Sequence, residues 1–351
     1  MAAAVRRTEV SDQPAPKLVI GANGFLGSHV TRRLVDDGHQ VRVMVRENAN
    51  TISIDDLDVQ RYVGDIWDND KLRDAMAGCD EVYYCVVDAR GWLRDPAPLF
   101  HTNVEGSRNV LDIAKDAGLH RFIFTSSYVT VGRRRGRRTS EADIIKDRGL
   151  TPYVRSRVQA EELVLRYARE HHLPAIAMCV STTYGSGDWG RTPHGAIIAG
   201  AAFGKLPFVM SGIELEAVGV DDAARAMILA AEHGRIGERY LISEKMISNA
   251  AVARIAAEAA GVAPPAKTIP LPMTYALATM GTLKARLRHT DERLSLGSLR
   301  LMRAEGPLDH GKAVHELGWQ PRPVEESIRA AARFWVGLRA AKKQAKVAQS
   351  E

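Results

Sequence analysis

A segment of about thirty residues near the start of the chain constrains the fold more than any other feature. Residues 17–46 have the sequence KLVIGANGFLGSHVTRRLVDDGHQVRVMVR. A short apolar run at 18–20 leads into closely spaced glycines, an amphipathic segment follows at 25–35, and an alternating apolar run begins at residue 41. Strand, glycine turn, helix and strand in this order predict a βαβ unit.

The three glycines of the turn have separate physical roles. Gly21 allows the chain to turn sharply, Gly24 allows backbone amides to approach a diphosphate, and Gly27 allows the helix to pack closely on the strand. The first turn of the helix adds unpaired N–H groups and a partial positive charge. We therefore predict a dinucleotide site rather than a plain structural turn. The predicted contact residues are Gly21, Asn23, Gly24, Phe25, Leu26 and Gly27.

Composition limits the class of protein around this unit. The chain has 351 residues, of which 45% are hydrophobic and 26% charged, enough for one large α/β domain with a substantial core. Cys79, Cys85 and Cys179 are odd in number and widely spaced. That spacing argues against a disulfide framework and against a thiolate metal site, and it favours the reducing cytoplasm. We predict no metal site.

The apolar pattern and the charge of the chain argue against a membrane-spanning protein and against a nucleic-acid-binding protein. Residues 1–16 are polar and predict a flexible leader, residues 342–351 form a basic tail, and no apolar run approaches the roughly 20 residues of a membrane-spanning helix. The net charge is +6, and the run GRRRGRR occupies residues 132–138. No recognition helix or aromatic platform accompanies this run, so we predict no nucleic-acid partner.

Strands and helices alternate from residue 17 onward, with helices expected at 98–117 and from Pro152 to about Glu170. This alternation predicts an α/β fold with a doubly wound parallel sheet. We assign residues 17–180 to this nucleotide-binding core and expect residues 214–242 to join it. Residues 181–213 and 243–341 are predicted to form a smaller, mostly helical substrate lobe. This lobe is expected over the carboxyl edge of the sheet, where ligands of such folds bind.

The end of the second strand bears on the form of the cofactor. An arginine there can pair with the 2′-phosphate of NADP, whereas an acid accepts the ribose hydroxyl of NAD. The strand ends Val45-Arg46-Glu47, so we favour NADP through Arg46 and keep NAD through Glu47 as the alternative. Asp65, after the third strand, is placed to meet the adenine, although acids in such positions are also common turn formers.

Ser127, Tyr153 and Arg157 form a candidate proton-transfer group. A phenol moves protons near neutral pH only when a nearby cation favours its ionised form. Tyr153 and Arg157 are four residues apart, so they share one face of a helix. A serine hydroxyl at the end of a strand can hold the same carbonyl oxygen. An ordinary surface tyrosine and arginine are the alternative.

Six motifs in the right order resemble those of the extended short-chain dehydrogenase/reductases, in the NAD(P)-dependent epimerase/dehydratase group, which have a Rossmann-type fold. They are the Gly21-x-x-Gly24-x-x-Gly27 turn, TNVEGSRNVL at 102–111, FTSS at 124–127, YGSGD at 184–188, VDDAARA at 220–226 and ELGWQP at 316–321. Within the group, the strand VRVMVR at 41–46 is similar to that of dihydroflavonol-reductase-like enzymes. Residues 270–301 are similar to the 3β-hydroxysteroid dehydrogenase branch.

The resemblance implies roles for individual residues. Tyr153 is the expected acid/base, Ser127 the partner of the carbonyl oxygen, and Asn103 a residue on the nicotinamide side. The family's lysine is replaced by Arg157, which keeps the positive field but cannot release a proton. Further cofactor contacts are expected at Ile66, Val86, Val180 and Thr182, and substrate contacts at Tyr128, Tyr184 and Trp189. The resemblance also implies a homodimer built on the helix that carries Tyr153.

Three functions are consistent with these residues. The first is an NADP-preferring reductase or dehydrogenase that acts on the carbonyl or secondary alcohol of a fairly apolar small molecule. The second is a sugar-nucleotide epimerase or dehydratase, and the third is a non-catalytic NADP-binding sensor or scaffold. The retained Tyr153 and Ser127 favour an enzyme, and we expect a reductase.

Two surface features leave alternatives open. Met273, Leu277, Met280 and Leu287 form a helical stripe that predicts core packing over the active site, with a membrane-surface helix as the alternative. The arginine run at 132–138 predicts a solvated loop, with recruitment of an anionic substrate such as a coenzyme A thioester as the alternative. His171 and His172 are adjacent and are predicted to be surface residues rather than metal ligands.

Overall fold

The computed structural model describes residues 14–133, 136–146, 150–302 and 307–348. Its centre is a seven-stranded sheet in which every neighbouring pair of strands is parallel. In spatial order the strands are β3 (Gln60–Val63), β2 (Val41–Val45), β1 (Lys17–Ile20), β4 (Glu81–Tyr84), β5 (Arg121–Ser127), β6 (Ala175–Val180) and β10 (Arg239–Ile242). The order of the strands reverses between β1 and β4, and a crevice for ligands is expected at that reversal in such sheets.

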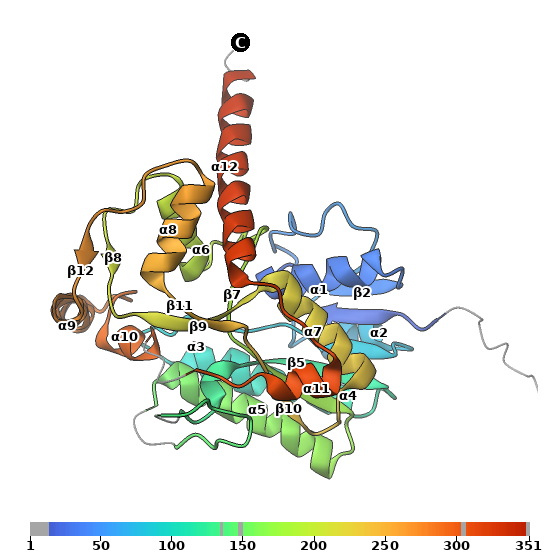
Figure 1. Ribbon diagram of the computed structural model, residues 1–351. Coiled ribbons are helices and arrows are strands. Elements are labelled where there is room, and N and C mark those ends of the chain that lie inside the picture. Colours follow the sequence, from blue (N-terminus) through green and yellow to red (C-terminus); the bar gives the residue numbers. More distant parts are fainter. Residues whose placement is uncertain (1–13, 134–135, 147–149, 303–306, 349–351) are drawn as a thin grey trace, which may run out of the picture.

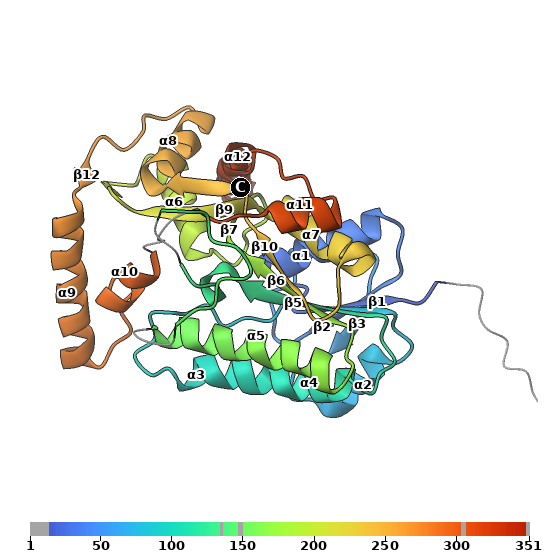
Figure 2. The same ribbon diagram turned by 60° about the horizontal axis from the view of Figure 1, so that its bottom comes forward.

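Helices cover both faces of this sheet (Figures 1 and 2). One face packs against α1 (Phe25–Asp36), α7 (Val220–His233) and α11 (Gly311–Leu317), and the other against α2 (Asn69–Met76), α4 (Ser107–Ala114) and α5 (Pro152–Glu170). Leu18, Val19 and Ile20 of β1 are each at most 1% exposed. A continuous apolar run is what a strand covered on both faces requires. The predicted doubly wound Rossmann-type sheet is confirmed.

The lobe over the carboxyl edge contains two small sheets as well as helices. β7 (Thr182–Tyr184), β9 (Glu214–Gly219) and β11 (Lys245–Ser248) form one sheet, and β8 (Val209–Met210) pairs with β12 (Thr268–Ile269). A separate apolar core joins α6 (Pro193–Ala202), α8 (Asn249–Ala259) and α12 (Val324–Ala348). The remaining lobe helices are α9 (Leu271–Arg288) and α10 (Leu296–Met302).

The boundary between core and lobe differs in one respect from the expected division. Of the segment 214–242, α7 packs against the main sheet and β10 extends it, but β9 belongs to the three-stranded sheet of the lobe. Where the core ends and the substrate lobe begins stays a prediction. The predicted leader lies largely outside the described residues, and the described part of the predicted tail, 342–348, continues α12.

A single helix was expected from Pro98 to Ala117, and the structure divides it. Helix α3 (Ala97–Phe100) passes into a π-helical turn, His101–Gly106, before α4 begins. A Cβ atom on Gly106 would lie 2.4 Å from the side chain of Ile66, so this turn approaches the loop after β3 more closely than another residue would allow. Such turns are frequent at functional sites, and this one carries Asn103.

Candidate active site

The glycine turn between β1 and α1 forms a cradle at the carboxyl edge of the sheet. Gly21 has φ +84°, and a Cβ atom there would lie 3.0 Å from Val86 and 3.1 Å from Cys85. A Cβ atom on Gly27 would lie 2.3 Å from the carbonyl oxygen of Gly21. Gly24 precedes α1 without a side-chain cap, and the first turn of α1 has no acidic residue. The amide groups of this helix terminus are therefore suited to an anion.

The loop after β2 is tied to this turn. The side-chain amide of Asn23 donates to the carbonyl of Asn50 at 3.3 Å, and the Ser53 hydroxyl donates to the carbonyl of Asn23 at 3.2 Å. Arg32 of α1 holds the same loop through Asp56 at 2.8 Å. The predicted contact residue Asn23 therefore also orders the loop beside the cradle. Phe25 and Leu26 are partly buried in the first turn of α1.

The two arginines of β2 differ in their surroundings. Arg42 donates to the carbonyls of Ala75 and Ala77 at the end of α2, at 3.1 and 2.7 Å, so its role is structural. Arg46 follows the strand and is exposed, and no described residue forms an ion pair with it. Asp65 is partly exposed after β3, and its carboxylate likewise has no hydrogen-bond donor among the described residues.

Several other predicted cofactor residues surround the same crevice. Val86 lies against Gly21 just beyond β4, and Ile66 is 7% exposed after β3. On the far side, Val180 ends β6 and Thr182 begins β7, with exposures of 7% and 8%. Their positions follow from a property of parallel sheets, in which the carboxyl ends of all strands meet at one edge.

Arg157 is a buried cation at the centre of the candidate site. Its side chain is on α5, it is 1% exposed, and it donates from Nη2 to the carbonyl of Thr125 on β5. Its guanidinium lies 5.5 Å from the centre of the Phe124 ring. Nε and Nη1 are buried and have no hydrogen-bond partner among the described residues. Two unsatisfied donors on a buried cation indicate a place for a ligand that supplies acceptors.

Tyr153 and Ser127 flank this cation. Tyr153 is in the first turn of α5, which Thr151 caps by accepting from the backbone of Val154, and no described residue bonds its hydroxyl. Ser127 ends β5, is 7% exposed, and accepts weakly from the backbone N–H of Val129 at 3.4 Å. α5 packs against β5 and against the short helix Tyr128–Thr130 that follows Ser127. The fold thus brings the segments that carry the three predicted residues together.

Asn103 has a different environment. It is 0% exposed, and its amide accepts from the backbone of Asp88 at 2.8 Å and donates to the carbonyl of Asp88 at 3.0 Å and to Ser156 Oγ at 3.1 Å. These bonds connect the loop after β4 to the first turns of α5. Asn103 therefore holds Ser156 and the loop after β4 next to Tyr153, and its side-chain amide is already hydrogen-bonded within the protein.

A buried network under the site was not predicted. Glu161, one turn after Arg157 on α5, is 3% exposed and accepts from Thr130 at 2.8 Å, Cys179 at 3.1 Å and Arg239 at 2.8 Å. Ser126 Oγ donates to the same carboxylate. Burial and the adjacent carboxylate raise the pKa of the Cys179 thiol well above its usual value. The four-residue spacing from Arg157 was the signal available in the sequence, because it puts Glu161 on the same helix face.

Of the predicted substrate contacts, Tyr128 follows β5 and Tyr184 ends β7. Tyr128 is 8% exposed and Tyr184 is 2% exposed, and burial raises the pKa of both phenols. Tyr184 packs edge-on against His194, whose pKa burial lowers to about 4. Trp189 packs edge-on against Phe334 of α12 at 4.9 Å. As substrate contacts, Tyr128, Tyr184 and Trp189 all stay predictions.

The lobe contributes a cover that was also not predicted. A Cβ atom on Gly91, in the loop after β4, would lie 3.1 Å from Leu301 of α10 and 3.4 Å from Tyr153. Two further contacts join the same loop to residues 290–295. The backbone N–H of Arg94 donates to Asp291 at 2.9 Å, and the guanidinium of Arg293 lies 5.4 Å from the centre of the Trp92 ring.

The arginine run is only partly described, because residues 134–135 lie outside the described residues. Arg137 pairs with Asp143 at 2.5 Å, and Arg138 donates to the carbonyl of Leu308 at 3.3 Å, so these two hold the loop itself. Arg133 lies with its guanidinium 4.8 Å from the centre of the Tyr128 ring. The predicted surface positions of His171 and His172 are confirmed, since both are exposed.

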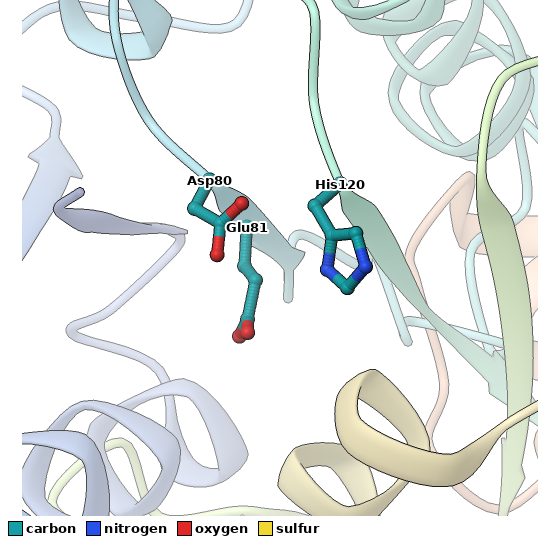
Figure 3. A group of neighbouring side chains, drawn as sticks. All are labelled: Asp80, Glu81 and His120. Carbon is teal, nitrogen blue, oxygen red and sulfur yellow. The ribbon is translucent and has the colours of Figure 1, made fainter. Parts of the chain in front are cut away.

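Asp80, Glu81 and His120 form a cluster of possible metal ligands at the amino ends of β4 and β5, with ligand atoms within 4.8 Å of one another (Figure 3). This is the edge of the sheet opposite the glycine turn. The Glu81 carboxylate already accepts from Lys17 at 2.9 Å and from Tyr83 at 2.5 Å, and both bonds are buried. The cluster thus has a structural explanation in the Lys17 ion pair.

The fold and site together define an NAD(P)-binding α/β oxidoreductase. The model of the NAD dependent epimerase/dehydratase family matches residues 17–243, and the chain belongs to this family. A solved structure described as that of gox2253 has 33% identity and a TM-score of 0.81, covering 92% of this chain and 98% of its own.

Two curated relatives have names that fit the resemblance noted in the sequence. A dihydroflavonol 4-reductase of Zea mays is 28% identical over 64% of this chain and 69% of its own length. A 3-beta-hydroxysteroid dehydrogenase of Mycolicibacterium neoaurum is 27% identical over 62% of this chain and 60% of its own. The predicted family and branch are confirmed, and the chain is an oxidoreductase of the short-chain dehydrogenase/reductase type.

The residues present fit a nicotinamide cofactor. The cradle that a Cβ atom would fill at Gly21, the uncapped start of α1 and the unsatisfied donors of Arg157 lie at the carboxyl edge of one sheet. In the described part of the chain, no helix is both apolar enough and long enough to cross a bilayer.

Proposed function

We propose that the protein is an NADP-preferring reductase of ketones, or a dehydrogenase of the corresponding alcohols, on fairly apolar substrates. The observation that carries this proposal is the group of Tyr153, Ser127 and Arg157, with the buried guanidinium unsatisfied at two nitrogens. The names of the two curated relatives, a dihydroflavonol reductase and a steroid dehydrogenase, support an apolar cyclic substrate.

Each residue of the group has a separate task. A bound nicotinamide would supply the hydride that reduces the carbonyl carbon. Tyr153 gives its phenolic proton to the carbonyl oxygen, and the Ser127 hydroxyl donates a hydrogen bond to the same oxygen. Arg157 stabilises the phenolate that remains and meets hydroxyl groups of the cofactor with Nε and Nη1. Because Arg157 cannot release a proton, Tyr153 is reprotonated by another route, for which solvent is the simplest source.

The preference for NADP rests on Arg46. It is exposed at the end of β2 without an ion-pair partner among the described residues, whereas Arg42 is held by backbone carbonyls. A guanidinium can bind a 2′-phosphate with two parallel hydrogen bonds. We further propose that the protein is a cytoplasmic homodimer formed through α5, as the family resemblance implies.

Calorimetric titration with NADPH and with NADH tests the cofactor assignment. We expect the native protein to bind NADPH more tightly than NADH. Arg46→Ala should weaken the affinity for NADPH by about tenfold or more and leave the affinity for NADH unchanged. Arg73→Ala is the matched control, because Arg73 is an exposed arginine on α2 that pairs with Asp70 at the surface. An equal loss of NADPH affinity in both variants would contradict a phosphate contact at Arg46, and so would tighter binding of NADH than of NADPH by the native protein.

Tyr153→Phe tests the chemistry separately. The variant should lose about a hundredfold or more of ketone reduction, because the proton donor is removed, while NADPH binding is kept. Unchanged turnover would show that another group is the acid. Net consumption of NADPH with a ketone distinguishes a reductase from an epimerase, which returns its cofactor unchanged.

A further inference from the structure

Helix α9 exposes a row of apolar side chains. Met273, Met280, Leu283 and Leu287 are 53%, 67%, 56% and 73% exposed. At 100° per residue, these four positions lie within about a quarter of the helix circumference. On the other face, Thr274 and Ala278 are 1% and 0% exposed. Single exposed apolar residues are normal on a protein surface, whereas a continuous row indicates a surface that binds something.

The charges of α9 are of one sign. The helix contains no aspartate or glutamate, and it carries Lys284, Arg286 and Arg288 near its end, all of them exposed. Lys284 pairs with Glu292 at 2.6 Å. Arg286 and Arg288 form no ion pair with a described residue, and Glu292 offsets only part of the charge of the three cations, so the apolar row ends beside an excess of positive charge.

The location of α9 connects this row with the active site. The helix lies at the outer edge of the lobe, and α10 packs against it on the inner side (Figures 1 and 2). Leu301 of α10 in turn lies next to Gly91, and Tyr153 lies next to the same glycine. The exposed row and the cover of the active site therefore belong to one pair of helices.

We propose that α9 docks the protein on an anionic lipid bilayer, lying in the plane of the surface with its apolar row among the acyl chains. Lipid phosphates complement Arg286 and Arg288. A second copy of α9 offers no acidic residue to these arginines, which is why a bilayer fits better than self-association. Docking in this way places α10 and the cover of Tyr153 beside a reservoir of apolar molecules.

Flotation with vesicles tests the proposal on the full-length protein. One set of vesicles is phosphatidylcholine alone, and the other contains about one-third phosphatidylglycerol, which gives a strongly negative surface. The native protein should float with the anionic vesicles and only weakly with the neutral ones. Absence of binding to both sets would overturn the proposal, whatever the protein reduces, because the assay needs no turnover.

Two matched pairs of variants locate the surface. Leu283→Glu should reduce binding to anionic vesicles by about tenfold or more, whereas Ile236→Glu, at a site 50% exposed between α7 and β10, should not. Arg286→Gln with Arg288→Gln should remove the preference for anionic vesicles, and the exposed pair Arg329→Gln with Arg333→Gln on α12 should leave it unchanged.

Size-exclusion chromatography with light scattering completes the test. The exposed positions are chosen so that the variants fold, and an unchanged Tm checks this. Equal binding by native protein and Leu283→Glu would place the contact elsewhere. A native dimer that Leu283→Glu converts to a monomer, without vesicle binding, would show that α9 joins two copies and would overturn the lipid proposal.

Discussion

At the scale of single residues, two glycines of the same turn have different neighbours and should respond differently to substitution. Gly27→Ala places a methyl group 2.3 Å from the carbonyl oxygen of Gly21, so α1 must move away from β1. We expect a loss of about 1–3 kcal/mol in the free energy of unfolding. In Gly24→Ala the nearest atom is 3.2 Å away, and the fold should be kept.

The difference appears when stability and binding are measured together. Gly24→Ala should show a Tm close to the native value but much weaker NADPH binding, because the added methyl group lies where the diphosphate approaches. Gly27→Ala should show a lower Tm. The same Tm for both variants would contradict the packing described for Gly27.

His29 and Asp221 provide a pH-dependent contact at the residue scale. His29 Nδ1 lies 2.6 Å from the Asp221 carboxylate, and Nε2 lies 3.0 Å from the carbonyl oxygen of Ser186. The hydrogen bond from His29 is the main cause that lowers the pKa of Asp221, and Arg322 lowers it further.

The sign of the effect follows from linkage. A carboxyl whose pKa is lower in the folded state stabilises the fold above its unfolded pKa, about 3.9, and this contribution is lost as the pH falls through the folded pKa. We therefore expect the stability difference between the native protein and Asp221→Asn to shrink below about pH 4. Urea unfolding at pH 7, 5 and 3 measures it. A difference that does not shrink between pH 5 and pH 3 would contradict the ion pair.

At the scale of elements, α5 carries both the candidate catalytic residues and their support. Glu161→Ala removes the acceptor of four donors and leaves Arg239, with a side chain 19% exposed, without its partner. We expect a loss of about 3–5 kcal/mol in the free energy of unfolding, measured in urea. Glu162→Ala, one residue away and exposed, is the control and should change little.

The elements of the core were predictable because local pattern and burial agree there. Helix α5 spans Pro152–Glu170 as expected, since Pro152 suits its first turn and the apolar period continues to its end. The π-helical turn at Asn103 was not predictable, because it depends on how closely Gly106 approaches Ile66, residues 40 positions apart. Contacts between distant segments leave no local signal.

At the scale of the whole molecule, the candidate site also contains some residues that the sequence predicted and others that it did not. Motifs predicted the candidate cofactor residues, because most of them follow strand ends whose geometry is fixed by the parallel sheet. They also predicted Tyr153, which lies in the first turn of α5. The Glu161 network and Leu301 were missed, since their partners come from β6, β10 and a helix of the lobe. The exposed row of α9 was visible as a stripe, but only the structure shows that it faces outward, against the predicted core packing of that stripe.

The order of segments along the chain has a consequence for how substrate choice can diversify. The seven-stranded sheet is complete at Ile242, before α9 and α10 begin, yet α10 supplies Leu301, which lies next to Gly91 in the loop beside Tyr153. Exchanging the segment 270–302 between relatives would therefore alter the surroundings of Tyr153 while leaving every strand of the seven-stranded sheet in place. The candidate proton-transfer residues and the segment that could change substrate choice are therefore encoded in different parts of the gene, which can vary independently.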